Sequence, residues 1–152
     1  MAPMDPHSQV AQLIQRASEA QAQLETYDQA AVDELVIATA WALVNPDNNQ
    51  KLSELAVAET GLGKVADKVI KNHRKTLGLL RDLRDAKTVG VINRDPQLGI
   101  VEIARPVGIV GAIVPSTNPV ATPMNMILNA LKCRNAIILS PTSSPARCAA
   151  PP

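Results

Sequence analysis

The chain of 152 residues contains no phenylalanine, one tryptophan and one tyrosine. Surfaces that bind single-stranded nucleic acid stack bases on several aromatic side chains, which this chain cannot supply. Its charge is nearly balanced, because 15 lysines and arginines face 14 aspartates and glutamates and leave a net charge of +1. So small a charge gives no general attraction to a phosphate backbone. We therefore expect no nucleic-acid partner.

Cysteine and histidine are also scarce. Cys133 and Cys148 lack a CxxC spacing, and His7 and His73 are far apart without neighbouring ligand residues, so we expect neither a metal site nor a disulfide framework. No apolar run approaches the ~18 residues of a membrane span, and the N-terminus lacks the basic and apolar regions of a secretory signal. We expect no membrane contact, and the cytoplasm is the default compartment.

Residues 105–141 carry the pattern with most functional content. An apolar run at 108–114 predicts a buried strand, a polar turn follows at 116–119, and 120–131 has the helical period before a second apolar run at 136–139. A strand, a crossover helix and a parallel strand form a βαβ unit, which helices must cover on both faces. Open α/β sheets bind ligands at the carboxyl ends of their strands, where this turn lies.

The first half of the chain predicts helices. Apolar periodicity indicates a first helix over residues 8–27 and a second that begins after the N-cap Asp28 and ends at Asn45-Pro46. A third helix is expected over 50–60, with Gly61 as its left-handed C-terminal residue, and a fourth over 65–87. We expect Trp41 and its apolar neighbours to be available for burial in the second helix. Residues 45–49 are expected to form a linker.

A row of lysines follows the third helix. Gly61-Leu62-Gly63-Lys64 lacks the preceding strand and the spacing of a phosphate-binding loop, so a helix stop and restart is favoured. Lys64, Lys68, Lys71 and Lys75 share one face of the fourth helix and could meet the phosphates of a nucleotide or coenzyme A. The interspersed Asp67, Asp82 and Asp85 favour an ordinary solvated face.

Residues 88–104 have the pattern of a β-hairpin, with a turn expected at 93–96. Two strands alone are marginally stable in water. The hairpin therefore needs a partner sheet in the same chain or in a second subunit, and a purely structural role and an oligomer contact are about equally supported.

Three segments resemble the coenzyme A-acylating branch of the aldehyde dehydrogenase superfamily, which includes sulfoacetaldehyde-type enzymes and the aldehyde half of bifunctional aldehyde/alcohol dehydrogenases. They are TGLGKVADKVIKN at 60–72, RPVGIVGAIVPSTNP at 105–119 and LKCRNAIILSP at 131–141. The resemblance covers about residues 31–141 and implies the N-terminal part of a longer enzyme, so we expect a fragment.

The resemblance implies an α/β fold, with a helical N-terminal half, a bridging hairpin and the first βαβ unit of an incomplete, Rossmann-like NAD-binding sheet. The expected divisions are 1–87, the N-terminal helices of the NAD-binding domain; 88–104, the bridging hairpin through which full-length relatives form homo-oligomers; 105–141, the βαβ unit; and 142–152, an irregular tail.

The family's chemistry implies a small-molecule aldehyde as substrate, NAD or NADP as cofactor and coenzyme A as co-substrate. A cysteine thiolate attacks the aldehyde, hydride leaves for the nicotinamide, and coenzyme A accepts the acyl group. In family members that nucleophile lies in the catalytic domain, which this sequence does not include. Neither Cys133 nor Cys148 is expected to replace it. We therefore expect the isolated chain to be inactive. Two alternatives stay open: a truncated product that at most binds nucleotide weakly or pairs with a subunit, and a fragment of a non-acylating aldehyde dehydrogenase.

The expected site lies in the polar turn and at the end of the second strand. Water-using relatives place an oxyanion-binding Asn where this chain has Thr117, so Thr117 or Asn118 is the catalytic candidate, for an oxyanion contact or positioning, and Asn118 could instead cap the next helix. Ser140 replaces a ribose-binding Lys, as is typical of the acylating branch; the hydroxyl of Ser143 is expected beside it. The cofactor candidates are Pro115, Ser116, Thr117, Ser140, Pro141 and Thr142, and no metal is expected.

Overall fold

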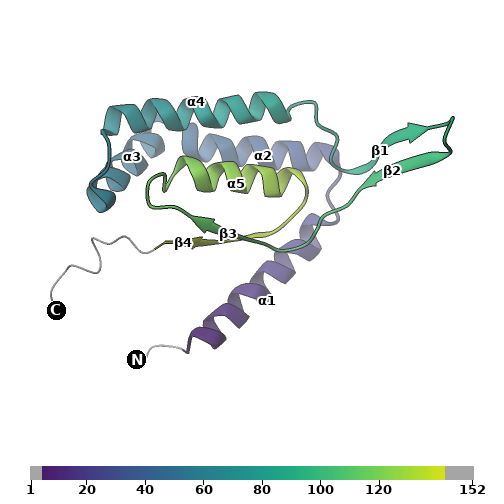
Figure 1. The fold of residues 1–152 in the computed structure, drawn as a ribbon, viewed down its shortest axis with the longest axis horizontal. Helices are drawn as coiled ribbons and strands as arrows, with labels where there is room; N and C mark the ends of the chain where they lie inside the picture. Colours follow the sequence, from purple (N-terminus) through teal and green to yellow (C-terminus); the bar gives the residue numbers. More distant parts are fainter. Residues whose placement is uncertain (1–4, 143–152) are drawn as a thin grey trace.

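The computed structural model describes residues 5–142. Four helices come first: α1 (Pro6–Leu24), α2 (Gln29–Val44), α3 (Pro46–Thr60) and α4 (Val65–Leu83). A hairpin follows, formed by β1 (Gly90–Asp95) and β2 (Ile100–Ala104), and then β3 (Val110–Val114), α5 (Ala121–Lys132) and β4 (Ile137–Pro141). The predicted α/β class and order of elements are confirmed (Figure 1).

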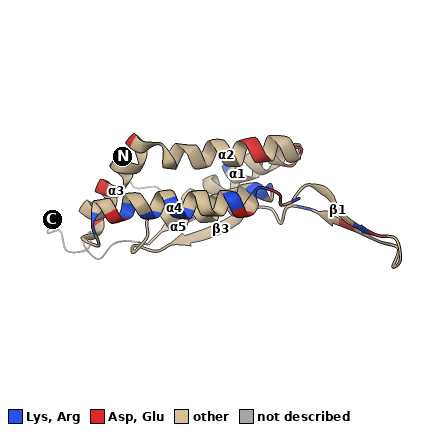
Figure 2. Cartoon of the chain, turned by 90° about the horizontal axis from the view of Figure 1, so that it is seen from above, with Lys and Arg blue, Asp and Glu red and all other residues tan. Residues whose placement is uncertain are grey.

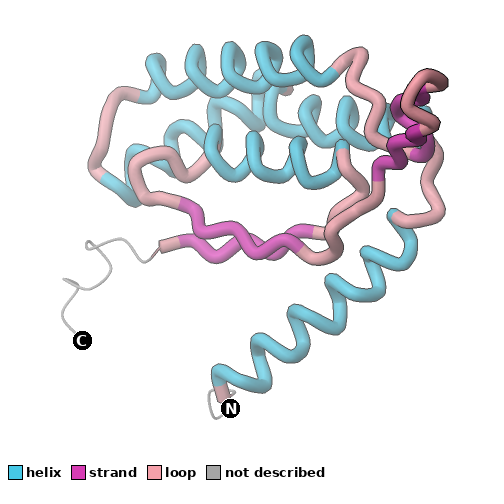
Figure 3. Tube along the Cα trace, turned by 45° about the vertical axis from the view of Figure 1, so that its right-hand side comes forward, coloured by secondary structure: helices cyan, strands magenta, loops and turns pink. Residues whose placement is uncertain are grey.

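The elements form layers around the β3–β4 sheet. Helices α2, α4 and α5 pack side by side above one face of the sheet, and α1 crosses below it and contacts β4 (Figures 1 and 3). The core of the helical layer contains Val32, Val36, Ala40 and Leu128, all buried. A second cluster joins α1 to the sheet through Ala17, Leu24 and Ala136. Helices therefore lie on both faces, as a buried βαβ unit requires.

Local chemistry explains the helix boundaries. Asp28 caps α2 as predicted, because its Oδ1 accepts a hydrogen bond from the Ala31 amide at 2.9 Å. Gly61 ends α3 with a positive φ of 67°, which glycine adopts without a Cβ clash. The expected linker at 45–49 is wrong: Asn45 Oδ1 accepts from the Asp47 amide, and Pro46 takes the first helical position. Proline is tolerated there because that N–H has no partner inside the helix.

Polar side chains, rather than leucines, fill the contact between α3 and α4. Asn72 Nδ2 donates to Asn49 Oδ1 at 2.9 Å and to Ser53 Oγ at 3.1 Å, and all three side chains are buried. Asn49 Nδ2 donates in turn to the Val69 carbonyl at 3.0 Å. Leu55 of α3 is exposed, although its spacing in the sequence matches the apolar period of a helix.

The outer surfaces of α1 and α2 also depart from the periodic pattern. Val10, Leu13 and Ile14 in the first half of α1 are exposed. Trp41, expected to be available for burial, is 59% exposed on α2. Neither face is covered by another element in the described part of the chain, because α1 reaches the sheet only through its C-terminal half.

The β1–β2 hairpin extends away from the helical layer (Figures 1 and 3). Its strands pair antiparallel from Gly90 and Ala104 outward, and β1 includes residues 93–95 that were expected to turn. The turn comes at 96–99. The Asp95 carboxylate stabilises it by accepting hydrogen bonds from the amides of Gln97 and Leu98, at 2.9 and 3.0 Å. Large apolar side chains of the arm are exposed: Val91, Ile92, Leu98, Ile100, Val101 and Ile103.

In residues 5–142 every helix is too short or too polar to cross a lipid bilayer. The same residues contain no grouping of three or more histidine, cysteine or acidic side chains that could hold a metal ion.

Candidate functional site

The two parallel strands end at the same edge of the sheet, and this edge carries the predicted site. Val114 lies opposite Pro141 in the register. Thr142 is attached to the end of β3, because its amide and its hydroxyl both donate to the Val114 carbonyl at 3.0 Å. The sheet therefore brings the segments Pro115-Ser116 and Ser140-Pro141-Thr142 together, as the sequence predicts.

The donor set at this edge consists of neutral hydroxyl groups. Ser140 and Thr142 are exposed and Ser116 is half-buried, so all three are accessible. The Thr142 hydroxyl donates its proton to Val114 and retains only its accepting lone pairs. Hydroxyl groups suit the ribose hydroxyls of a dinucleotide and offer no charged contact, so these residues fit a nicotinamide cofactor. The predicted Ser143 lies outside the described residues.

Asn118, in the polar turn after β3, is bound by a side chain from another helix. Lys71 Nζ donates a hydrogen bond to Asn118 Oδ1. An ammonium group can only donate, so the carbonyl end of the amide must face the lysine. The Asn118 NH2 group then points away from the lysine and makes no hydrogen bond within residues 5–142.

Asn118 does not cap α5, which corrects the alternative role that the sequence allows. The N-cap position is Val120, and no side chain caps this helix. The amides of Ala121 and Thr122 in the first turn therefore lack a side-chain acceptor, and the positive end of the helix dipole faces the polar turn. Thr117 is exposed in the same turn.

A cleft of about 220 Å³ lies between α4 and the start of α5. Its lining residues are Lys71, Lys75, Asn118, Ala121, Thr122 and Asn125. No carboxylate belongs to this lining, and two of the side chains are cationic. The cleft is thus a short, positively charged depression that shares Asn118 with the predicted site.

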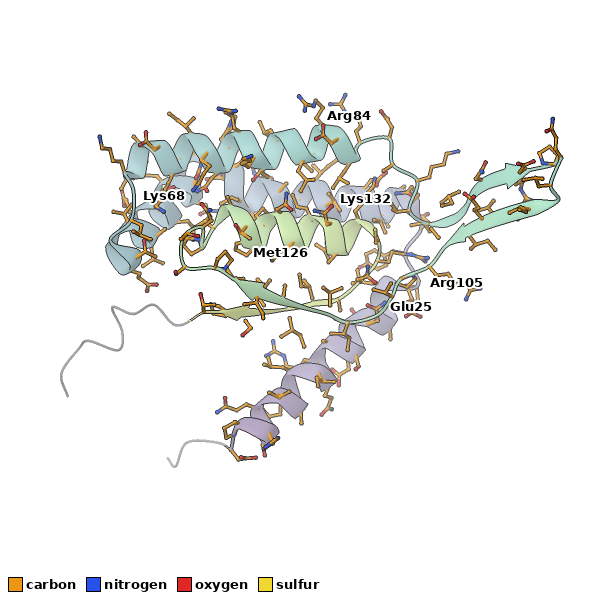
Figure 4. All side chains as sticks on the ribbon, viewed as in Figure 1. Glu25, Lys68, Arg84, Arg105, Met126 and Lys132 are labelled. Carbon is orange, nitrogen blue, oxygen red and sulfur yellow. The ribbon has the colours of Figure 1, made fainter. Side chains whose placement is uncertain are left out.

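The lysine row was expected to be an ordinary solvated face, and this prediction is wrong for two of its members. Lys68 is only 7% exposed, and Figure 4 places it at the same end of the molecule as the start of α5. Lys71 is half-buried against the polar turn. Figure 2 shows the positive charges along α4. The sequence predicts the spacing of the lysines but not that Lys71 contacts the polar turn.

Burial and, to a lesser degree, the neighbouring Lys71 ammonium lower the pKa of Lys68 from its ordinary 10.5. Both causes act against the charged form, because burial removes hydration and a like charge repels. Within the described residues Lys68 forms no ion pair that would offset these two causes.

Cys133 lies at the other end of α5, as its C-cap, and is an exposed free thiol. It follows a helix of 12 residues that starts beside the polar turn. At 1.5 Å per residue this separates Cys133 from Asn118 by about 18 Å. The two cannot act on the same carbonyl group. Cys148 lies outside the described residues.

Comparison with known proteins identifies a family model. The model described as "Aldehyde dehydrogenase family" matches residues 2–150. The sulfoacetaldehyde dehydrogenase (acylating) of Cupriavidus necator is 60% identical over 133 residues, which are 88% of this chain and 27% of that protein. The chain thus spans about a quarter of the length of this curated relative.

Solved structures share the fold. The acetylating aldehyde dehydrogenase of Geobacillus thermoglucosidasius superposes with a TM-score of 0.84 at 40% identity, over 93% of this chain and 31% of that one. The propionaldehyde dehydrogenase of Rhodopseudomonas palustris, solved with bound propionyl-CoA, gives a TM-score of 0.70 at 27% identity, over 85% and 28% of the two chains.

Proposed function

Because the chain belongs to the aldehyde dehydrogenase family, within its coenzyme A-acylating branch, we propose that it forms the N-terminal part of an enzyme that converts an aldehyde, NAD and coenzyme A into an acyl-coenzyme A and NADH. The observation that carries this proposal is the meeting of the predicted turn and strand-end residues at one edge of the β3–β4 sheet. The 60% identity to an acylating relative supports the choice of branch.

We assign the cofactor to the hydroxyl-bearing edge of the sheet. Ser116 and Ser140 would donate hydrogen bonds to ribose or phosphate oxygens, and Thr142 would accept one from a ribose hydroxyl, since its own proton is engaged. Pro115, Thr117 and Pro141 would line the same edge. When bound, the nicotinamide supplies the acceptor for hydride; the chain's residues supply its orientation.

Asn118 is our candidate for the oxyanion contact. Its Oδ1 is occupied by Lys71, so its NH2 group is available to donate to the aldehyde oxygen as that oxygen gains negative charge. A donor whose orientation is fixed beforehand needs no rearrangement during the reaction, which is the source of its catalytic benefit. Thr117 is exposed in the same turn and is the second candidate donor.

We assign residues 88–104 to a bridging arm that contacts a second subunit. The arm leaves six large apolar side chains exposed and extends beyond the helical layer. A two-stranded hairpin gains little stability alone, so burial of these side chains against another subunit would stabilise it.

A chimera tests the function. Residues 5–141 of this chain replace the matching segment of the Cupriavidus necator enzyme, and coenzyme A-dependent NADH formation is measured with an aldehyde. We expect turnover comparable to the parent. Asn118→Ala in the chimera should lower kcat/KM by about 100-fold, the usual cost of an oxyanion donor, whereas Asn93→Ala in the hairpin should not.

Two outcomes would contradict the proposal separately. A folded chimera that binds NADH and shows no turnover would contradict the assigned function. Full activity of the Asn118→Ala chimera would leave the function standing and remove Asn118 from the site, in which case Thr117→Val is the next variant to measure.

A further inference from the structure

We propose that the pocket between α2 and α4 binds a monocarboxylic acid with an apolar chain of medium length, and that Lys132 and Arg84 hold its carboxylate. The pocket has a volume of about 500 Å³. Lys132, which lines it, is the last residue of α5, whereas the polar turn precedes the start of that helix. The 12 residues of α5 span about 18 Å at 1.5 Å per residue. A ligand in this pocket is therefore neither the substrate nor the cofactor of the proposed function.

The least exposed charged group of the pocket is the ammonium group of Lys132, whose side chain is 3% exposed. Its Nζ donates one hydrogen bond, to Asp33 Oδ1 at 2.5 Å, and Asp33 also lines the pocket. An ammonium group has three protons, and the other two have no acceptor within residues 5–142. Because buried polar groups are almost always hydrogen-bonded, water or a ligand in the pocket must accept these two protons.

The charges of the pocket require one negative charge. Its three cations are Lys132, Arg81 and Arg84, and its one anion is Asp33, which leaves an excess of two positive charges. Asp82 pairs with Arg81 at 3.0 Å and reduces the excess to one. Arg84 forms no hydrogen bond or ion pair through its side chain in the described part of the chain. Figure 4 places it at the same end of the helical layer as Lys132.

A carboxylate supplies this single charge. Its two oxygens can accept the free protons of Lys132 and the guanidinium protons of Arg84. A phosphate monoester carries a charge of about −1.5 to −2 at neutral pH, so it would leave the pocket with an excess of negative charge. The electrostatics therefore favour a carboxylate over a phosphate.

The rest of the pocket wall is apolar. Its side chains are Val36 and Ile37 from α2 and Leu77, Leu80 and Leu83 from α4. Ile37 and Leu77 are exposed to water, and covering them with an apolar chain is favourable. Ligand pockets typically combine such apolar walls with a few polar groups that fix the orientation of the ligand. A molecule with one charged end and an apolar chain matches this lining.

The volume of the pocket limits the length of that chain. About 500 Å³ has room for roughly 17 groups of the size of a water molecule, at ~30 Å³ each. An acid of about 8 to 12 carbons has about 10 to 14 non-hydrogen atoms and would fill most of this space. A nucleotide or coenzyme A carries several negative charges and does not match the single excess charge.

The experiment uses the 152-residue chain labelled with 15N, at constant ionic strength. The probe is octanoate, kept below the concentration at which it forms micelles. 1-Octanol keeps the chain without the charge, acetate keeps the charge without the chain, and octyl phosphate exchanges the head group. We expect octanoate to cause saturable shifts of the backbone amides of Ile37, Leu80 and Arg84, and octanol and acetate to bind about tenfold more weakly.

Three variants test the two cations. Lys132→Met removes the buried ammonium group and should weaken octanoate binding about tenfold, the effect of losing a hydrogen bond to a charged group. Arg84→Gln should weaken it about threefold, because this side chain is exposed. Arg74→Gln removes the same charge from α4 outside the pocket and should leave the affinity unchanged. If Lys132→Met does not fold, the comparison of Arg84→Gln with Arg74→Gln decides.

Equal affinities for octanoate and octanol would overturn the inference, because the pocket would then select only for an apolar chain. Tighter binding of octyl phosphate than of octanoate would also overturn it, since the head group would then need more than one charge. Absent or unsaturable shifts, or equal affinities in Arg84→Gln and Arg74→Gln, would mean that octanoate only coats exposed apolar surface, and the inference would be wrong.

Discussion

The ammonium group of Lys71 donates a hydrogen bond to Oδ1 of Asn118, which lies 47 residues further along the chain. The contact joins the middle of α4 to the turn that follows β3. Because an ammonium group has no acceptor, it fixes which end of the Asn118 amide faces the helix. The site thus depends on a lysine outside the segment that carries the functional motif.

Replacing Lys71 by methionine should release the Asn118 side chain. Without the ammonium donor the amide can flip between its two orientations, and its motion on the ps–ns timescale should increase. The heteronuclear NOE of the Asn118 NH2 group measures this directly, and we expect it to fall. Lys75→Met removes the same charge without this bond, so an equal fall in that variant would contradict the positioning role.

The buried amide of Asn72 should be important for stability. Asn72→Ala removes two hydrogen bonds between α4 and α3 and should lower the free energy of unfolding by about 2 kcal/mol. Asn72→Asp should cost more, because a buried carboxylate would face the Asn49 carbonyl oxygen. Urea unfolding followed by circular dichroism measures both. The exposed neighbour His73→Ala is the control, and a similar loss there would argue against the network.

The ion pair of Lys132 and Asp33 should respond unequally to removal of its two partners. The atoms lie 2.5 Å apart, with side-chain exposures of 3% for Lys132 and 36% for Asp33. Asp33→Asn leaves a buried ammonium without a counter-charge and should cost about 3 kcal/mol. Lys132→Met leaves a carboxylate that water and Gln29 can still solvate, so its cost should be well under half of that.

Equal losses in the two variants, measured by urea unfolding, would contradict this account. Such a result would mean that the ion pair stabilises the fold through the attraction between its two charges, and that the burial of Lys132 contributes little to the cost of removing Asp33. The double variant Asp33→Leu with Lys132→Met is expected to be close to the wild type, since neither charge remains.

Lys68 should make stability depend on pH. Its folded pKa lies below the unfolded value near 10.5, so in that interval the unfolded chain binds more protons and stability rises with pH. Below the interval the folded state retains the full cost of the buried charge. Lys68→Met should therefore be more stable than the wild type at pH 7, and the difference should shrink as pH approaches 10.5. For Lys51→Met, the difference in unfolding free energy from the wild type should not change with pH. If this difference grew with pH for Lys68→Met, the expected direction of the pH dependence would be wrong.

The isolated chain should not form NADH from acetaldehyde, NAD and coenzyme A. The reaction needs a thiolate beside the oxyanion donor, and Cys133 is at the opposite end of α5 from Asn118. A spectrophotometric assay at 340 nm is sufficient. Robust turnover that survives in Cys133→Ser would show that another group acts as nucleophile.

The sequence predicted the family, its acylating branch and the order of elements correctly, because short motifs and hydrophobic period are local properties. Asp28 and Gly61 were identified for the same reason: a cap requires only a residue type at one position. A parallel crossover also places the carboxyl ends of β3 and β4 at the same edge of the sheet, where Thr142 bonds to Val114.

The errors concern contacts between elements distant in sequence. Leu55 has the helical period of a core residue, but the facing surface of α4 offers Asn72, so the polar side of α3 turns inward. Lys68 and Lys71 have the spacing of a solvated row, and only the fold shows that Lys68 is buried and that Lys71 contacts the polar turn. The period of a sequence shows that a helix has an apolar or charged face, but not which other element packs against that face.

Trp41 is the chain's only tryptophan and is 59% exposed on α2. Its emission should be close to that of indole in water already in the native state and readily quenched by iodide. Intrinsic fluorescence will therefore report poorly on unfolding of the core. The same exposure makes Trp41 a built-in probe for anything that covers this side of α2, because contact there would shift its emission to the blue without any added label.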